Sequence, residues 1–126
     1  MMKVSTPRTS AAECSLSAKP ELRERPLLAR GQSGELAGLF VVLANDTRLR
    51  LLHALARKDE LCVNDLARAV GMKPQAVSNQ LQRLADKRIL ENRRDGISIL
   101  YRIVDPCVIN LLDQGLCLLE DAKRRS

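Results

Sequence analysis

The sequence predicts a mainly α-helical domain with one small β-hairpin. Apolar residues recur at helical spacing over most of residues 35–124, and an Asp95-Gly96 dipeptide separates two segments of alternating β-forming residues. Hydrophobic residues make up 45% of the 126 residues and aromatic residues only 2%, so we expect an aliphatic core built mostly of leucine. This length suits one domain with a tail, which excludes barrel enzymes and two-lobed kinases.

The first 34 residues are rich in Ser, Thr, Pro, Gly and charged residues and show no sustained period. We expect residues 1–34 to form a flexible arm with one short helix near Glu21 to Ala29. The helical pattern that begins at residue 35 is interrupted once, where Asn45 or Asp46 is a natural N-cap for a second helix. The folded domain is therefore expected over residues 35–124.

Downstream elements follow in a recognisable order. Asn64 caps a short helix that Gly71 ends, and Pro74 starts a helix of about thirteen residues with one apolar face and one amide-and-hydroxyl face. A basic hairpin turning at Asp95-Gly96 and a final helix after Pro106 complete the chain. This order predicts a winged helix-turn-helix, in which the second helix of the pair enters the DNA major groove.

The polar face of the longer helix carries side chains that recognise bases. Asn and Gln bond adenine edges in a bidentate way, and Ser can serve either base of a pair. Residues 68–94 hold seven basic and two acidic residues, which places much of the formal net charge of +6 on this unit. Few aromatic residues are present for stacking, so double-stranded DNA is favoured over RNA. The expected base contacts are Gln75, Ser78, Asn79 and Gln82, and the expected phosphate contacts are Arg68, Lys73, Arg83, Arg93 and Arg94.

Three segments resemble the ArsR/SmtB repressors, which are dimeric winged-helix transcriptional regulators of bacteria that sense metals. The segments are residues 43–52, 60–67 and 76–81, the last running into the hairpin and Tyr101-Arg102, so the resemblance covers about residues 36–120. It implies a homodimer packed through its first and last helices, with two recognition helices about 34 Å apart on a near-palindromic operator. It also implies a metal ion as the effector.

Cysteine usage indicates the compartment and a first candidate effector site. Four cysteines in a chain without a recognisable secretory signal favour a reducing cytoplasm, where thiols stay available for metal or redox chemistry. In the metal-sensing relatives the second segment reads Leu-Cys-Val-Cys-Asp, whereas here Asn64 replaces the second cysteine. Cys62 would need another donor, for which the resemblance suggests Cys14, and the helix N-terminus favours its thiolate form. The alternative for Cys62 is a small buried hydrophobic residue.

The last helix offers a second candidate site. Asp105-Pro106-Cys107 resembles the Asp-x-His pair of zinc-sensing relatives, with Cys in place of His. Cys107 and Cys117 are ten residues apart, which is about 15 Å along a helix, so they could share one ion only across an antiparallel helix pair in a dimer. Packing in the dimer helix is the alternative role for both. Four Cys and one His favour mercury(II), arsenic(III), cadmium or lead over nickel and cobalt, with zinc less favoured.

The leading hypothesis is a repressor that releases its operator when a soft thiophilic ion binds cysteine thiolates. Two alternatives stay open: a cysteine-based redox-sensing repressor of the same fold, and a cytosolic metal-sequestering or protein-interaction module that does not bind DNA. We do not expect an enzyme, because no Gly-rich phosphate loop and no nucleophile beside a base stand out. No apolar run approaches the ~20 residues of a membrane helix, so no membrane partner is expected.

Overall fold

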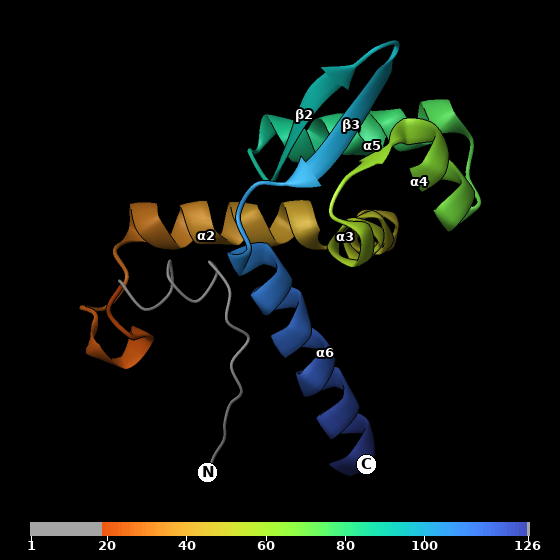
Figure 1. Cartoon of the computed structure of the whole chain (residues 1–126). Helices are drawn as coiled ribbons and strands as arrows, with labels where there is room; N and C mark the ends of the chain where they lie inside the picture. The colour runs from red at the N-terminus through yellow and green to blue at the C-terminus, as the bar shows by residue number, and fades with distance from the viewer. Residues whose placement is uncertain (1–18, 126) are drawn as a thin grey trace. The chain divides into compact units, whose positions relative to one another are not determined.

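The computed structural model describes residues 19–125 (Figure 1). These residues divide into two units. The first unit, Leu28–Val104, contains four helices and three strands. The second, in its described part, comprises residues 19–27 and 105–125 and contains the 3-10 helix η1 (Leu22–Glu24) and the C-terminal helix α6 (Cys107–Arg125). The elements of the first unit are α2 (Arg30–Leu43), α3 (Asp46–Lys58), β1 (Leu61–Cys62), α4 (Val63–Val70), α5 (Pro74–Asp86), β2 (Leu90–Asp95) and β3 (Ser98–Ile103).

The helix-turn-helix pair has the predicted order. Helix α4 ends at Gly71, whose φ of +69° lies in the left-handed region that glycine tolerates best, and its N–H bonds the carbonyl of Ala67. Helix α5 starts with Pro74 at its first position and runs for 13 residues, as the sequence predicts. Together with the hairpin that follows, the pair forms a winged helix-turn-helix.

No helix in residues 19–125 combines the length and apolar character needed to cross a membrane.

The hairpin is part of a larger sheet than the sequence predicts. The antiparallel order is β1-β3-β2, with Leu61 opposite Tyr101 and Cys62 opposite Leu100 at the added strand. The sequence predicts the turn at Asp95-Gly96, but Asp95 pairs with Ser98 as the last residue of β2. The two-residue loop is therefore Gly96-Ile97, and Gly96 adopts the positive φ of +67° that the first central position of a type II′ turn requires.

Helix boundaries differ from the sequence pattern at two places. Helix α2 begins at Arg30, so residues 30–34 are helical rather than part of an arm, and the short helix expected near residues 21–29 is reduced to η1. Helix α4 begins at Val63, which makes Cys62 its N-cap residue and puts Asn64 in its first turn. The cap of α3 is as expected, because the Asn45 side chain accepts a hydrogen bond from the Arg48 N–H at 3.0 Å.

Leucine dominates the core of the unit Leu28–Val104, which confirms the aliphatic prediction. Tyr101, at 5% exposure, is the one aromatic side chain in this core, and burial raises the pKa of its hydroxyl. Because this core joins α3, α4 and α5, it holds α5 against the rest of the unit. The leucines exposed by 1% or less in these helices are Leu51, Leu52, Leu55, Leu66, Leu81 and Leu84.

Candidate nucleic-acid interface and cysteine positions

One face of α5 presents amide side chains to solvent. Gln75, Asn79 and Gln82 are exposed, and Ser78 is half-buried. Gln75 Nε2 donates to Asn79 Oδ1 at 3.2 Å, and Gln82 Nε2 donates to Asp86 Oδ1 at 3.0 Å. Both bonds join residues four positions apart, which orders the side chains along the helix surface. The geometry suits contact with base edges in a major groove.

Basic side chains surround the turn between α4 and α5. Lys73 is the N-cap residue of α5, and Arg68 lies in the last turn of α4 and forms an ion pair with Asp65. Both line an open hollow at this turn, together with Gly71. Arg83 is exposed farther along α5. Positive charge beside an exposed helix N-terminus is a favourable setting for a DNA phosphate.

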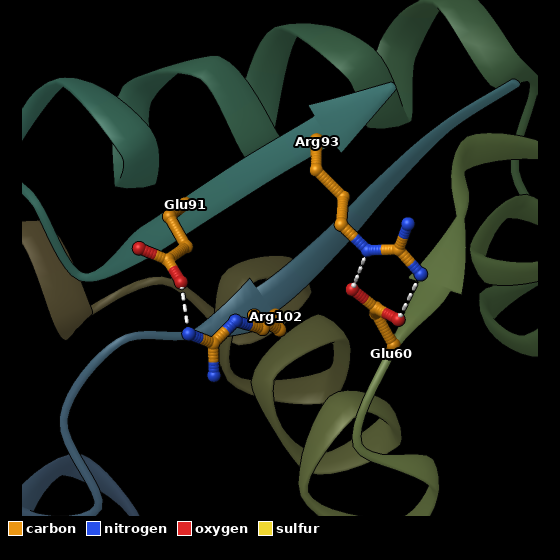
Figure 2. A network of polar contacts seen from close by, with 4 residues as sticks. All are labelled: Glu60, Glu91, Arg93 and Arg102. Carbon is orange, nitrogen blue, oxygen red and sulfur yellow. Dashed lines mark hydrogen bonds and ion pairs between the residues drawn. The ribbon is translucent and has the colours of Figure 1, made fainter. Parts of the chain in front are cut away.

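The β2–β3 hairpin is the wing of this fold, and its arginines differ in their surroundings, as Figure 2 shows. Arg93 on β2 donates from Nε to Glu60 Oε2 at 2.8 Å and from Nη2 to Glu60 Oε1 at 2.9 Å. Arg102 on β3 forms an ion pair with Glu91 on the neighbouring strand. Arg94 is exposed. Of the two predicted phosphate contacts on the wing, Arg93 therefore has an acidic partner within the protein.

The ion pair shifts the pKa values of both Glu60 and Arg93. Hydrogen bonds from the Arg93 guanidinium hold the pKa of the Glu60 carboxyl below its ordinary value, and the Arg93 charge adds to this effect. In turn the hydrogen bonds to Glu60 raise the pKa of Arg93. Both groups are charged at neutral pH, so Glu60 offsets one of the wing's positive charges.

Cys62 lies where the sheet meets the helix-turn-helix pair. It is half-buried, its backbone lies opposite Leu100, and it is the N-cap residue of α4 without a capping hydrogen bond from its side chain. Asn64, at the position of the second cysteine in the resembling sensors, is exposed. The suggested partner Cys14 lies outside the described residues. The sequence thus identifies the element that carries Cys62, and its role as a ligand remains a prediction.

Helix α6 carries the other two cysteines. Cys107 is its first residue, and its N–H donates to Asp105 Oδ1 at 2.8 Å, a hydrogen bond that lowers the pKa of the Asp105 carboxyl. Cys117 is exposed, and its thiol donates to Asp121 Oδ2 at 3.8 Å. Among residues 19–125, no three His, Cys, Asp or Glu side chains gather into a metal-binding group.

The chain matches a family of DNA-binding regulators. The family model described as bacterial regulatory protein, arsR family, matches residues 45–92, from the cap of α3 into β2. The transcriptional repressor SmtB homolog of Synechocystis sp. is 42% identical over 85 residues, which are 68% of this chain and 64% of that protein. The HTH-type transcriptional regulator NmtR of Mycobacterium tuberculosis is 38% identical over 98 residues, covering 76% of this chain and 81% of that protein.

Solved structures extend the similarity to the fold. The crystal structure of the AntR antimony-specific transcriptional repressor has a TM-score of 0.73 and 66% sequence identity, over 84% of this chain and 96% of that one. A homodimeric winged helix-turn-helix DNA-binding domain from Mycobacterium bovis has a TM-score of 0.68 and 28% identity, over 81% of this chain and 96% of that one. These relatives are transcriptional regulators rather than enzymes.

Proposed function

Because the chain belongs to the ArsR/SmtB family of winged helix-turn-helix transcriptional repressors, we propose that it holds an operator as a homodimer and releases it when antimony(III) binds. Arsenic(III) is the second candidate effector, since it shares the affinity of antimony for sulfur. The observation that carries the proposal is the 66% identity to an antimony-specific repressor, which extends over 84% of this chain.

The DNA-binding half of the proposal rests on α5, which is the proposed recognition helix, and on the wing. The exposed amides of α5 suit base edges, and the basic residues at both ends of α5 and on the wing suit phosphates. A two-fold dimer presents two copies of this surface, so the operator should consist of two half-sites one helical turn apart, about 34 Å. Lys73, Arg83 and Arg94 are the best placed for phosphates, because within residues 19–125 none of them has an acidic partner such as the one that Arg93 has.

The effector half of the proposal rests on α6. Cys107 and Cys117 lie ten residues apart on this helix, about 15 Å, so one ion cannot take both thiolates from a single copy. A second α6 would supply the missing thiolate, and the exposed Leu116, Leu118 and Leu119 give it an apolar surface to cover. We assign Asp105 to holding Cys107 in place through its backbone N–H. Mercury(II), cadmium and lead are weaker candidates, and zinc is weaker still.

Release then follows from linkage between the two sites. If the ion binds the conformation of low DNA affinity more tightly than the DNA-bound conformation, the affinity for the operator falls. DNA then weakens ion binding by the same factor. A coupling of about 1 to 3 kcal/mol corresponds to a loss of about 5- to 150-fold in operator affinity.

A direct titration tests the proposal. A duplex selected by the protein from a random library is labelled, and fluorescence anisotropy follows its complex as antimonite, arsenite, mercury(II), cadmium, lead or zinc is added. We expect antimonite to release the duplex at the lowest concentration, followed by arsenite. The sensor proposal is wrong if none of these ions lowers DNA affinity.

Single serine variants locate the site. We expect Cys107→Ser and Cys117→Ser to keep ion-free DNA affinity and to lose the antimonite response, whereas Cys62→Ser, the matched control, keeps both. A response lost instead in Cys62→Ser and Cys14→Ser would place the site at the start of α4. Sensitivity to peroxide that depends on Cys62, without a response to any ion, would favour the redox alternative.

A further inference from the structure

Arg48 connects three helices of the DNA-binding unit through one guanidinium group. Its Nε donates to Gln80 Oε1 on α5 at 2.8 Å, and its Nη1 donates to the Val42 carbonyl near the end of α2 at 2.9 Å. Arg48 itself lies in the first turn of α3, where its backbone N–H donates to the capping Asn45 side chain at 3.0 Å. One side chain therefore joins the end of α2 and the start of α3 to the recognition helix.

Both bonds join the positively charged guanidinium to an oxygen that accepts hydrogen bonds. The last carbonyls of a helix lack intrahelical partners and carry partial negative charge, so a cation beside Val42 is favourable. The guanidinium is planar and its donors are fixed relative to one another, so two bonds from one group restrict the angle between the elements that accept them. Arg48 and Gln80 are both half-buried, which limits competition from water.

Gln80 is thereby separated in role from the neighbouring amides. Asn79, one position earlier, is exposed and bonded to Gln75 on the base-contacting surface, whereas the Gln80 amide is directed to α3. At its near end, α2 exposes Phe40 and Val41, which a second copy of the chain would cover in the homodimer. The Arg48 bonds thus lie between the surface available for dimer contact and the helix available for DNA.

We propose that Arg48 and Gln80 are positioning residues for operator recognition, which fix the angle of α5 relative to α2 and so the separation of the two recognition helices in a dimer. This inference rests on the proposed function. Neither residue contacts DNA in this role. Both act on affinity only where two half-sites must be met at once, so discrimination between operator and random DNA depends on them and non-specific binding does not.

The test compares Arg48→Ala and Gln80→Ala with the wild-type full-length chain on three kinds of duplex. These are a duplex selected by the wild type, the same duplex with one base pair added or removed between its half-sites, and a random duplex. We expect each variant to bind the selected duplex about tenfold more weakly, which is comparable to the loss of one hydrogen bond to a charged group. Its affinity for random DNA should fall by less than twofold. The wild-type preference for the original spacing should shrink in both variants.

Control variants separate positioning from stability and charge. Arg57→Ala removes the same charge from an exposed position of the same helix and should leave discrimination unchanged. Gln80→Glu keeps an acceptor for Arg48 and should retain the spacing preference. The double variant Arg48→Ala with Gln80→Ala should lose no more affinity than Arg48→Ala alone, because Arg48→Ala already removes the bond to Gln80. Thermal unfolding of each variant confirms that assays are run on folded protein, and Gln80→Ala serves if Arg48→Ala does not fold.

If the wild type still prefers its selected duplex over random DNA, two outcomes would overturn this inference and leave the proposed function standing. One is that both variants retain wild-type affinity and spacing preference, and the other is that they lose affinity for selected and random duplexes equally. A wild-type protein that prefers no duplex over random DNA would overturn the proposed function and this inference with it.

Discussion

Arg93 and Glu60 link the wing to the segment that carries Cys62. Glu60 directly precedes β1, whereas Arg93 lies on β2 at the opposite edge of the sheet. Their two hydrogen bonds span β3 and fix the approach of the chain to the N-terminus of α4 (Figure 2). The pair is solvent-accessible, so we expect it to define local geometry more than global stability.

Replacing Arg93 should restore an ordinary pKa at Glu60. In the wild type the carboxylate is stabilised by hydrogen bonds from Arg93, so its contribution to stability is present above the ordinary carboxyl pKa and is lost as pH falls through the lowered one. Arg93→Ala should raise the Glu60 pKa, measured by NMR titration of its carboxyl carbon. Arg94→Ala, the neighbouring control, should not. An unchanged Glu60 pKa in Arg93→Ala would contradict this account.

Arg88 follows the recognition helix with a φ of +62°, a left-handed conformation that is uncommon for a residue with a side chain. Such a conformation costs roughly 1–2 kcal/mol, whereas glycine adds only about 0.4–1 kcal/mol of unfolded-state entropy. Arg88→Gly should therefore raise the free energy of unfolding by up to about 1 kcal/mol in urea denaturation. Arg83→Gly, inside α5, should lower it by about 1 kcal/mol. A less stable Arg88→Gly protein would show that its side chain outweighs the backbone strain.

The helices of the DNA-binding unit were predictable because their signals are local. Asn45 caps α3, Pro74 starts α5, and the apolar period of each helix matches its buried face. Helix α2 begins earlier than its apolar pattern indicates. Residues 30–34 contain two glycines and no apolar side chain, so no helical period is visible there. Strand β1 has two residues, too few for alternation to be visible, and it forms only because β3 offers a pairing edge.

The candidate DNA surface was predictable for the same reason, since helical spacing alone places the α5 amides on one face. The pairs formed by side chains were not. Arg48 and Gln80 are 32 residues apart, and Glu60 and Arg93 are 33 apart, so only the tertiary structure brings them together. The cysteine ligands stay a prediction, because a site shared between two copies of α6 depends on the assembled dimer.

Substitutions in and beside the recognition helix should distinguish base contacts from phosphate contacts. Asn79→Ala should cost about 1–3 kcal/mol on the selected duplex and relax the preference at one base pair, because the proposed bidentate contact to a base would be lost. Lys73→Ala should weaken selected and random duplexes alike and lower the salt-dependence slope by about 1. Anisotropy titrations over a range of salt concentrations measure both effects. Equal losses on both duplexes for Asn79→Ala would remove it from the base-contacting set.

At the scale of the whole molecule, α6 exposes apolar side chains that the proposed homodimer would cover. Leu116, Leu118 and Leu119 are each more than half exposed on this helix, and a relative of the same fold is homodimeric. Burial of such side chains against a second copy is favourable at about 25 cal/mol per Å² of apolar surface. Dimer formation should therefore be sensitive to charge introduced among these leucines.

Leu116→Glu should shift the protein toward monomer at micromolar concentration, as measured by analytical ultracentrifugation. Its affinity for a two-half-site operator should fall in parallel, because only one recognition helix then binds per protein molecule. Gln114→Glu introduces the same charge at an exposed polar position of α6 and should leave the dimer intact. A Leu116→Glu protein that remains dimeric would show that the dimer is built on other surfaces.

The strand order β1-β3-β2 leaves β2 at an edge of the sheet, where unpaired backbone groups could template the addition of a strand from another molecule. Its sequence, Leu-Glu-Asn-Arg-Arg-Asp, carries charge at four of six positions, and charged edges oppose such intermolecular pairing. The wing charges that suit DNA phosphates thus also protect the free protein against aggregation. Replacing the wing arginines with apolar residues to weaken DNA binding would therefore reduce solubility as well.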